Sequence, residues 1–189
     1  MSVQIEIPFT TKKGRSAIIR YPQLGDIEEM TRFINIFSLE NRFTRFAGEQ
    51  MTLAEEQAYL ESELEKIKQG DAVKLFCFVE GRLAGVCDIH RDLSLLTRKR
   101  HTGVFGIIIG QEFRGEGIGE KLMTETILQS QERIKDLKMI KLDCFSTNTP
   151  ALSLYAKMGF KEVGRIPKAL LHKNEYVDEV ILIKEIASF

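Results

Sequence analysis

The sequence predicts a single α/β domain, residues 1–189, in which a mixed β-sheet is covered by helices on both faces. The 189-residue chain is 43% hydrophobic, which is enough to bury one core. Residues 72–79 (AVKLFCFV) are apolar on both faces of an extended strand, with Leu75 and Cys77 on one side and Phe76 on the other. Such a strand is typical of the inside of a sheet that helices cover on each side. Strand-like and helix-like segments follow one another without an internal repeat, so we expect one layered domain.

Charge and composition exclude several classes of protein. Lysine plus arginine and aspartate plus glutamate number 27 each, so no basic surplus points to nucleic acid or to an anionic membrane. No apolar run approaches the roughly 20 residues of a membrane span, and the N-terminus lacks a signal-like hydrophobic segment. Cys77, Cys87 and Cys144 stand in apolar surroundings without disulfide or metal-ligand spacing. We therefore expect buried free thiols, no metal site and a cytoplasmic protein.

Hydrophobic periodicity places the remaining elements. Apolar residues at helical spacing predict two helices before the central strand. A glycine turn between two apolar runs predicts a hairpin, whose second strand carries Asp88 and His90 on one face. These two could be a proton-handling pair near a pocket or polar residues at a strand end. In order, we expect strands at residues 3–9 and 16–21, helices at 26–37 and 52–70, strands at 72–79, 83–91 and 101–109, a helix at 118–134, a strand at 139–146, a short helix at 149–158 and strands near 160–166 and 176–186.

The most informative stretch is residues 104–119 (VFGIIIGQEFRGEGIG), where an apolar run ends in a glycine-rich turn that opens a helix at Ile118. Segments of this kind hold phosphates, because glycines let the backbone approach the anion and the first helical N–H groups lack internal partners. A Walker A loop is excluded, since Glu116 stands where its lysine is required. A dinucleotide fingerprint is excluded as well, since Glu120 stands where its third glycine is required.

Two motifs in the chain resemble those of the GCN5-related N-acetyltransferase (GNAT) family. RGEGIG at residues 114–119 resembles the family's acetyl-CoA pyrophosphate loop, Arg-x-x-Gly-x-Gly. Residues 148–160 (NTPALSLYAKMGF) match the second family motif, Asn-x-x-Ala-x-x-Leu-Tyr-x-x-x-Gly-Phe, at every written position. On local grounds alone, these residues form a short helix capped by Thr149 that buries Tyr155. The two motifs occur in the family's order, with one helix and one strand between them, so residues 72–160 are similar to the family.

The resemblance implies the GNAT fold, a mixed and mostly antiparallel central sheet flanked by helices on both faces. It also implies an N-acetyltransferase with acetyl-CoA as cosubstrate. One strand would pair with the pantetheine arm, which requires the neighbouring strand to splay away. The acidic side chains of the loop, Glu112, Glu116 and Glu120, are expected to face solvent. The implied cofactor-binding residues are Ile107, Ile108, Ile109, Arg114, Gly115, Glu116, Gly117, Ile118, Gly119, Glu120, Asn148 and Tyr155.

The resemblance also suggests which groups move protons. Tyr155 matches the position whose hydroxyl lies near the thioester sulfur, where it would act as general acid; a tyrosine that only anchors its helix is the alternative. Asp143 is the candidate general base, at an offset where some peptide-N-terminus acetyltransferases carry glutamate, or else it pairs with Lys141 on the strand surface. Cys144 has no histidine spaced to activate it, so we expect direct attack by the amine within a ternary complex. Further candidates for the base are Asp88, His90 and Glu179.

The acceptor is less defined than the donor. We expect a small amine or amino acid; a protein N-terminus, as in ribosomal-protein acetyltransferases, and a non-catalytic acyl-CoA-binding sensor are the alternatives. By resemblance residues 41–50 (NRFTRFAGEQ) help line the acceptor pocket, but they could equally connect two helices. Residues 173–179 resemble the last hairpin of small-amine and ribosomal-protein relatives, and an exposed final strand could pair across a homodimer.

Overall fold

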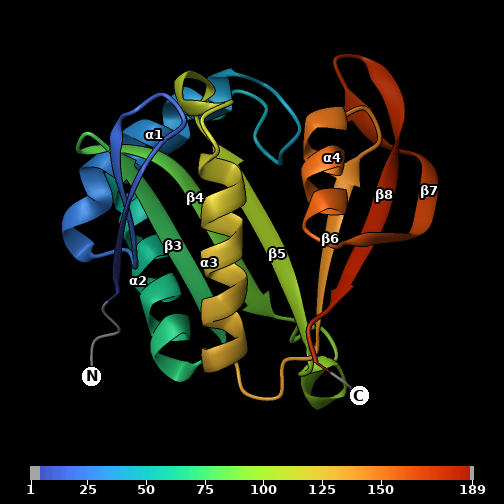
Figure 1. The fold of residues 1–189 in the computed structure, drawn as a ribbon. Coiled ribbons are helices and arrows are strands. Elements are labelled where there is room, and N and C mark those ends of the chain that lie inside the picture. Colours follow the sequence, from blue (N-terminus) through green and yellow to red (C-terminus); the bar gives the residue numbers. More distant parts are fainter. Residues whose placement is uncertain (1–4, 188–189) are drawn as a thin grey trace.

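The computed structural model describes residues 5–187, which form an eight-stranded sheet with the order β1-β2-β3-β4-β5-β6-β8-β7 (Figure 1). β5 and β6 pair in parallel, and the other neighbouring strands pair antiparallel, so the predicted mixed and mostly antiparallel sheet is confirmed. Residues 3 and 4 of the first predicted strand lie outside the described residues. The strands are β1 (Glu6–Thr10), β2 (Ser16–Arg20), β3 (Ala72–Val79), β4 (Arg82–Arg91), β5 (Thr102–Ile109), β6 (Met139–Phe145), β7 (Lys161–His172) and β8 (Glu175–Glu185). The helices are α1 (Ile27–Leu39), α2 (Leu53–Gln69), α3 (Ile118–Arg133) and α4 (Thr149–Lys157), with single 3₁₀ turns at Leu24–Asp26, Leu96–Lys99 and Gln111–Phe113.

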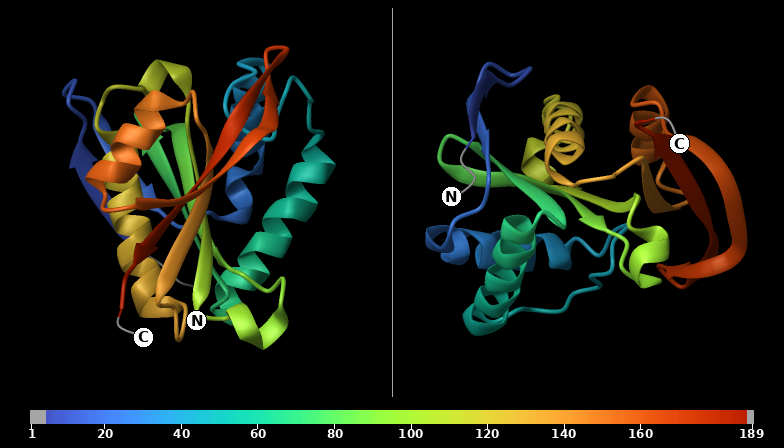
Figure 2. Two further views of the ribbon diagram at one scale, coloured as in Figure 1. Left: turned by 90° about the vertical axis from the view of Figure 1, so that its right-hand side faces the viewer. Right: turned by 90° about the horizontal axis from the view of Figure 1, so that it is seen from below.

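Helices cover both faces of the sheet, α1 and α2 on one face and α3 and α4 on the other (Figure 2). The central strand β3 supplies side chains to both layers, as its sequence predicts. Leu75 and Cys77 belong to the core beneath α3, and Phe76 and Phe78 belong to the core beneath α1 and α2. Phe76 is fully buried, and burial of a side chain of this size stabilises the fold by about 1.5–3 kcal/mol.

The starts of α2 and α4 are capped differently. At α2, the Thr52 hydroxyl accepts the Glu55 N–H at 3.2 Å and the Glu55 carboxylate accepts the Thr52 N–H at 2.8 Å, as a capping box requires. At α4 the prediction is wrong by one residue, because Asn148 rather than Thr149 is the N-cap. The Asn148 side chain makes no capping hydrogen bond, so its amide remains available to another partner.

The final strand is not at an edge of the sheet. β8 pairs with β6 on one side and with β7 on the other, so the predicted homodimer cannot form by pairing of an exposed final strand. The long C-terminal hairpin explains the difference, since β7 turns back at its end and places β8 inside. Leu171 and Tyr176 of this hairpin are exposed.

β5 and β6 separate along their length. Their parallel pairing is limited to Thr102, Gly103 and Val104 of β5, and the following residues of β5 pair with β4 alone. Figure 1 shows the two strands diverging towards the end at which α4 lies. The splay that the family resemblance requires is therefore present, and it leaves one backbone edge of residues 105–109 without a neighbouring strand.

The cysteines are buried and free, as predicted. Burial raises the pKa of Cys77 to about 12 and that of Cys144 to about 11, so these thiols stay protonated and are poor nucleophiles. Within residues 5–187, no helix combines the length and the apolar character that crossing a membrane requires.

Candidate active site

The loop between β5 and α3 presents backbone N–H groups to a cavity. Gly115 and Gly117 have φ angles of +77° and +81°, in the left-handed region that glycine adopts without strain. Gly117 is the N-cap of α3, and its carbonyl accepts the Lys121 N–H at 3.1 Å in the first bond of the helix. The N–H groups of residues 118–120 therefore have no acceptor within the helix and lie at its positive end, an arrangement suited to an anion.

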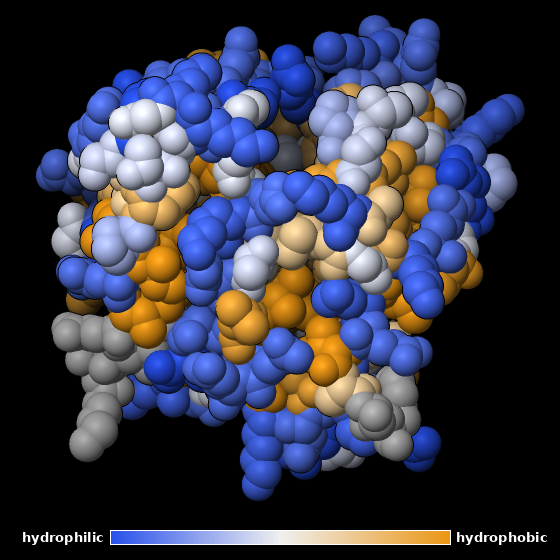
Figure 3. All heavy atoms as spheres, viewed as in Figure 1, coloured by the Kyte–Doolittle hydropathy of each residue, from blue (hydrophilic) through white to orange (hydrophobic). Residues whose placement is uncertain are grey.

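A cavity of about 410 Å³ lies between this loop, the open edge of β5 and α4. Apolar side chains are visible in the groove between α3 and α4, and the surface is hollowed above it (Figure 3). All the predicted cofactor-binding residues except Glu116 line this cavity. They are Ile107, Ile108, Ile109, Arg114, Gly115, Gly117, Ile118, Gly119, Glu120, Asn148 and Tyr155.

Arg114 has spare hydrogen-bonding capacity at this cavity. Its Nε donates to the Ile109 carbonyl at 2.9 Å, and its Nη2 pairs with Glu40 at the end of α1. Its Nη1 is buried and has no acceptor among the described residues. A buried guanidinium nitrogen without an acceptor is costly, and a phosphate in the cavity would supply one. The residues present therefore fit the pyrophosphate of acetyl-CoA.

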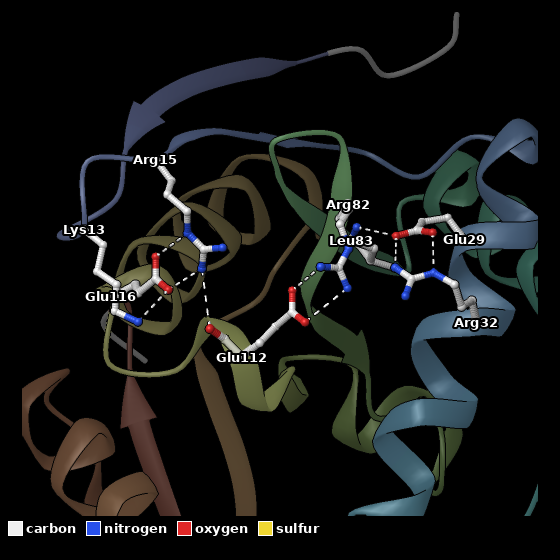
Figure 4. A network of polar contacts seen from close by, with 8 residues as sticks. All are labelled: Lys13, Arg15, Glu29, Arg32, Arg82, Leu83, Glu112 and Glu116. Atoms are coloured by element: carbon white, nitrogen blue, oxygen red, sulfur yellow. Dashed lines mark hydrogen bonds and ion pairs between the residues drawn. The ribbon is translucent and has the colours of Figure 1, made fainter.

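Glu116 contradicts the sequence prediction, since its side chain is fully buried and does not face solvent. It pairs with Arg15, and the Lys13 Nζ lies 3.3 Å from the same carboxylate (Figure 4). The hydrogen bond from Arg15 is the main cause that lowers the pKa of Glu116 to about 2. The basic turn between β1 and β2 thus contacts the loop through both the side chain and the backbone of Glu116, since the Lys12 N–H donates to the Glu116 carbonyl at 3.0 Å.

The other acidic loop residues match the prediction more closely. Glu112 is about half exposed and pairs with Arg82, so Figure 4 shows the polar contacts continuing from the loop to the β3–β4 hairpin. Glu120 is partly exposed and pairs with Lys157 at 2.7 Å. In the sequence, the only signal for the buried carboxylate was the complementary charge of the turn at residues 12–15.

A second cavity of about 890 Å³ lies on the other side of β5, beneath α2 and residues 43–46. It shares Ile107, Ile108 and Tyr155 with the smaller cavity, so the two meet beside Tyr155. The Tyr155 ring is buried and packs edge-on against Phe105 at 6.0 Å between ring centroids. Burial raises the pKa of Tyr155, which keeps its hydroxyl protonated, as a general acid requires.

Asp143 of β6 also lines the larger cavity, as Tyr155 does. Its side chain is 38% exposed, and the Lys141 Nζ lies 3.3 Å from its Oδ1. The sequence left Asp143 either as the general base or as a partner of Lys141. The structure is compatible with both, because the carboxylate borders the cavity and also pairs with Lys141.

The far wall of the larger cavity carries a buried ionic network. The Lys74 Nζ lies 3.0 Å from Glu63 and 3.5 Å from Asp88, and it contacts the Tyr59 hydroxyl at 2.6 Å. The His90 Nε2 lies 2.8 Å from Asp88 and 3.1 Å from Glu63. Burial opposes a charge on His90, but hydrogen bonds to Asp88 and Glu63 outweigh it and raise the pKa of His90 to about 9. His90 is therefore a cation at neutral pH.

The sequence identified only part of this network. Asp88 and His90 were predicted to share a face, but Glu63 and Lys74 were not identified as site residues. Lys74 is the one charged residue in an otherwise apolar strand, which is the signal that could have revealed it. Glu63 stands among apolar α2 residues that pack on the core, and its side chain is 1% exposed.

Residues 41–50 cover the junction of the two cavities. Phe43 and Thr44 line both of them. The Phe43 ring reaches across to His172 of β7 and Phe145 of β6, at centroid distances of 4.6 and 5.6 Å. The segment is therefore more than a helix connection, since it bridges the two halves of the splayed sheet.

The comparisons with known proteins agree with this geometry. The sequence pattern of the Acetyltransferase (GNAT) family matches residues 33–160. This chain belongs to the GNAT family. It is 30% identical to the L-amino acid N-acetyltransferase AaaT of Escherichia coli K12 over 105 residues, which are 56% of this chain and 63% of that protein. It is also 26% identical over 152 residues to an N-alpha-acetyltransferase of Sulfurisphaera tokodaii, across 80% of this chain and 84% of that protein.

A GNAT acetyltransferase from Streptococcus pneumoniae has a similar structure, with a TM-score of 0.81 and 28% identity over 90% of this chain and 99% of that chain. As a GNAT protein the chain is an acetyl-CoA-dependent acyltransferase. The β1–β2 hairpin that holds Glu116 lies outside the region matched to the family.

Proposed function

We propose that this GNAT protein transfers an acetyl group from acetyl-CoA to the primary amine of a small amine or amino acid. The observation that carries the proposal is the meeting of the two cavities beside Tyr155. One cavity has the features of a phosphate and pantetheine site, and the other, which opens to solvent, offers space for an acceptor. The E. coli relative named as an L-amino acid N-acetyltransferase supports an acceptor of this size.

In this proposal the loop residues hold the cofactor. Backbone N–H groups at the start of α3 and the free Nη1 of Arg114 bind the pyrophosphate. The open backbone edge of Ile107, Ile108 and Ile109 pairs with the pantetheine arm, and Asn148 supplies its free amide. Bound acetyl-CoA supplies the activated acetyl thioester. No acyl-enzyme forms, since the buried cysteines are protonated.

Proton transfer is assigned to Tyr155, which lines both cavities, and to Asp143, which lines the larger one. The acceptor nitrogen attacks the thioester carbonyl carbon within a ternary complex, so that a C–N bond forms and the C–S bond breaks. The Tyr155 hydroxyl gives its proton to the departing sulfur. Asp143 accepts the proton from the amine, directly or through one water, since its carboxylate is partly exposed at the same cavity.

A protein N-terminus is the alternative acceptor, supported by the Sulfurisphaera relative named as an N-alpha-acetyltransferase. A cavity that residues 41–50 partly cover is less suited to an extended peptide than to a small molecule, so we favour the small amine. A screen of thiol release from acetyl-CoA against amines, amino acids and short peptides tests the choice. We expect the highest kcat/KM with a small amine or amino acid.

The screen can contradict the proposal in two ways. Faster turnover with peptides would replace the small acceptor by a protein N-terminus. Binding of acetyl-CoA without thiol release for any acceptor would indicate a non-catalytic acyl-CoA sensor. Calorimetry with acetyl-CoA, done on the same protein, separates the second outcome from a protein that does not bind the cofactor.

A further inference from the structure

Two carboxylate oxygens on the wall of the larger cavity lack hydrogen-bond donors. The Glu56 residue is only 5% exposed, and its Oε2 has no hydrogen-bond partner among the described residues. The Glu63 Oε2 is also buried without a well-aligned donor. The Lys74 Nζ and the His90 Nε2 nevertheless lie 3.0 and 3.1 Å from it, so two cations compensate the charge of this oxygen.

Both carboxylates point from the same face of α2. Glu56, Tyr59 and Glu63 follow one another at spacings of three and four residues, and all three line the larger cavity. Seven residues of helix rise by about 10 Å, so the two oxygens border a strip of the cavity wall rather than one point. Lys66 pairs with the other oxygen of Glu63 at 2.8 Å, which leaves Oε2 directed elsewhere.

The charges around Glu56 differ from those around Glu63. Glu63 and Asp88 are compensated by Lys74 and His90 within the network. Glu56 has no ion pair of its own among the described residues. Burial raises its pKa, and the charges of Arg45 and Lys74 oppose this only in part.

A buried carboxylate oxygen without a donor is costly, and a ligand that brings a donor and a positive charge relieves the cost most effectively. Water supplies a donor but no charge. An ammonium group supplies up to three donors together with the opposite charge. The cavity wall therefore fits a cationic group of the acceptor, at a distance from the amine that reacts beside Tyr155.

We infer that the acceptor carries a second positive charge, as in a diamine or a basic amino acid, and that the buried Glu56 carboxylate binds it. This inference rests on the proposed function and names its acceptor class. The reacting amine lies at the β5 end of the cavity, where it must lose a proton. The second amine stays protonated against the α2 wall and positions the first.

Initial rates with 1,4-diaminobutane and with 4-amino-1-butanol test the inference, since these acceptors share their length and differ in the second charge. For the wild-type enzyme we expect kcat/KM to be about tenfold or more higher with the diamine, the range of one charged hydrogen bond. Glu56→Gln should lower this ratio to near one, because the amide has the same shape without the charge.

Glu61→Gln is the matched control, since Glu61 is an exposed carboxylate on α2 that contacts Gln57 and does not line the cavity. It should keep the wild-type ratio. Equal kcat/KM for the two acceptors in the wild-type enzyme would overturn the inference, and so would a folded Glu56→Gln variant that keeps the preference. Either result leaves acetyl transfer itself intact, whereas absence of thiol release with every amine counts against the proposed function.

Discussion

The two cavities that meet beside Tyr155 are built in opposite ways. The smaller one is formed mainly by two short stretches of sequence, residues 107–120 and 148–155, with further contacts from Lys12, Phe37 and residues 42–44, and its loop end presents backbone N–H groups. The larger one is formed by side chains from α1, α2, β3, β4, β5, β6 and residues 43–46. The comparison teaches that a backbone-built anion site depends on local conformation, whereas a side-chain-built cavity depends on strand register and helix placement.

The two sites also handle charge differently. At the loop, positive potential comes from α3 and Arg114, and the buried Glu116 serves as an anchor that faces away from the cavity. At the α2 wall, full charges are paired in the interior, with Lys74 3% exposed. Substitutions at the junction, the wall and the loop can therefore separate chemistry, stability and cofactor binding.

The largest effect is expected at the junction. Tyr155→Phe should lower kcat by about 10²–10⁴-fold, because it removes the proton donor while the ring still fills its buried site. Isothermal titration should show unchanged affinity for acetyl-CoA. An unchanged kcat in a folded variant would exclude the acid role and leave Tyr155 as a helix anchor.

A large loss of stability is expected at the wall. Lys74→Met removes the buried cation and leaves Glu63 and Asp88 with less compensation, which should lower the free energy of unfolding by about 3–5 kcal/mol. Lys66→Met removes a half-exposed partner of Glu63 and should cost less than about 1 kcal/mol. Urea denaturation measures both, and similar losses for the two variants would show that the Lys74 network is not stabilising.

At the loop, Glu116→Gln should raise KM for acetyl-CoA by roughly tenfold, since the Arg15 and Lys13 contacts that hold the backbone are weakened. The pKa of Glu116, lowered to about 2, also predicts that the stability of the fold decreases at acidic pH. Its stabilisation is present above the ordinary pKa of 4.5 and is lost as pH falls towards about 2.

Between pH 2 and 5, the melting temperature of Glu116→Gln should decrease less with falling pH than that of the wild type. Glu112→Gln is the control, because the Glu112 side chain is about half exposed and pairs with Arg82 at the surface. A KM increase of the same size in Glu112→Gln would mean that the loop responds to any loss of negative charge.

The raised pKa of His90 predicts a smaller loss of stability at alkaline pH. Its ion-pair partners at the wall of the larger cavity are Glu63 from α2 and Asp88 from β4, and both carboxylates also pair with the like-charged Lys74 of β3. Because the pKa of His90 is raised to about 9, its stabilisation is present below the ordinary value of 6.5 and is lost as pH rises through about 9. Denaturation at pH 6 and pH 10 should show this decline in the wild type and less of it in His90→Gln; parallel pH profiles would argue against a charged His90.

The smallest effect is expected for Lys12, which lines the smaller cavity beside Gly117. Lys12→Ala should raise KM for acetyl-CoA only a few-fold, because an exposed lysine contributes to phosphate binding mainly through long-range charge. The increase should shrink at high salt. A salt-independent change would point to altered hairpin structure rather than to lost charge.

Most of the fold and most of the residues that line the smaller cavity could be predicted because their signals are local. The nearly continuous apolar run at residues 72–79 gave the bounds of β3 without error, and apolar residues at helical spacing predicted α2 close to its observed bounds. The positive φ angles of Gly115 and Gly117 and the start of α3 are properties of a few consecutive residues. The motif that contains Tyr155 is equally local, so its position at the cavity followed from the sequence.

The tertiary structure alone decided which charged residues meet. A one-residue bulge between Cys77 and Phe78 shifts the β3–β4 register, so that Lys74 faces Asp88; with regular pairing from the turn it would face Cys87. The burial of Glu116 depends on a hairpin about 100 residues away, and the position of Glu63 depends on how α2 packs on β3 and β4. Local sequence was thus sufficient for the loop conformation at the start of α3 and for the short helix that carries Tyr155. The ionic wall of the larger cavity required the tertiary structure, because strand register and helix packing set which distant side chains meet.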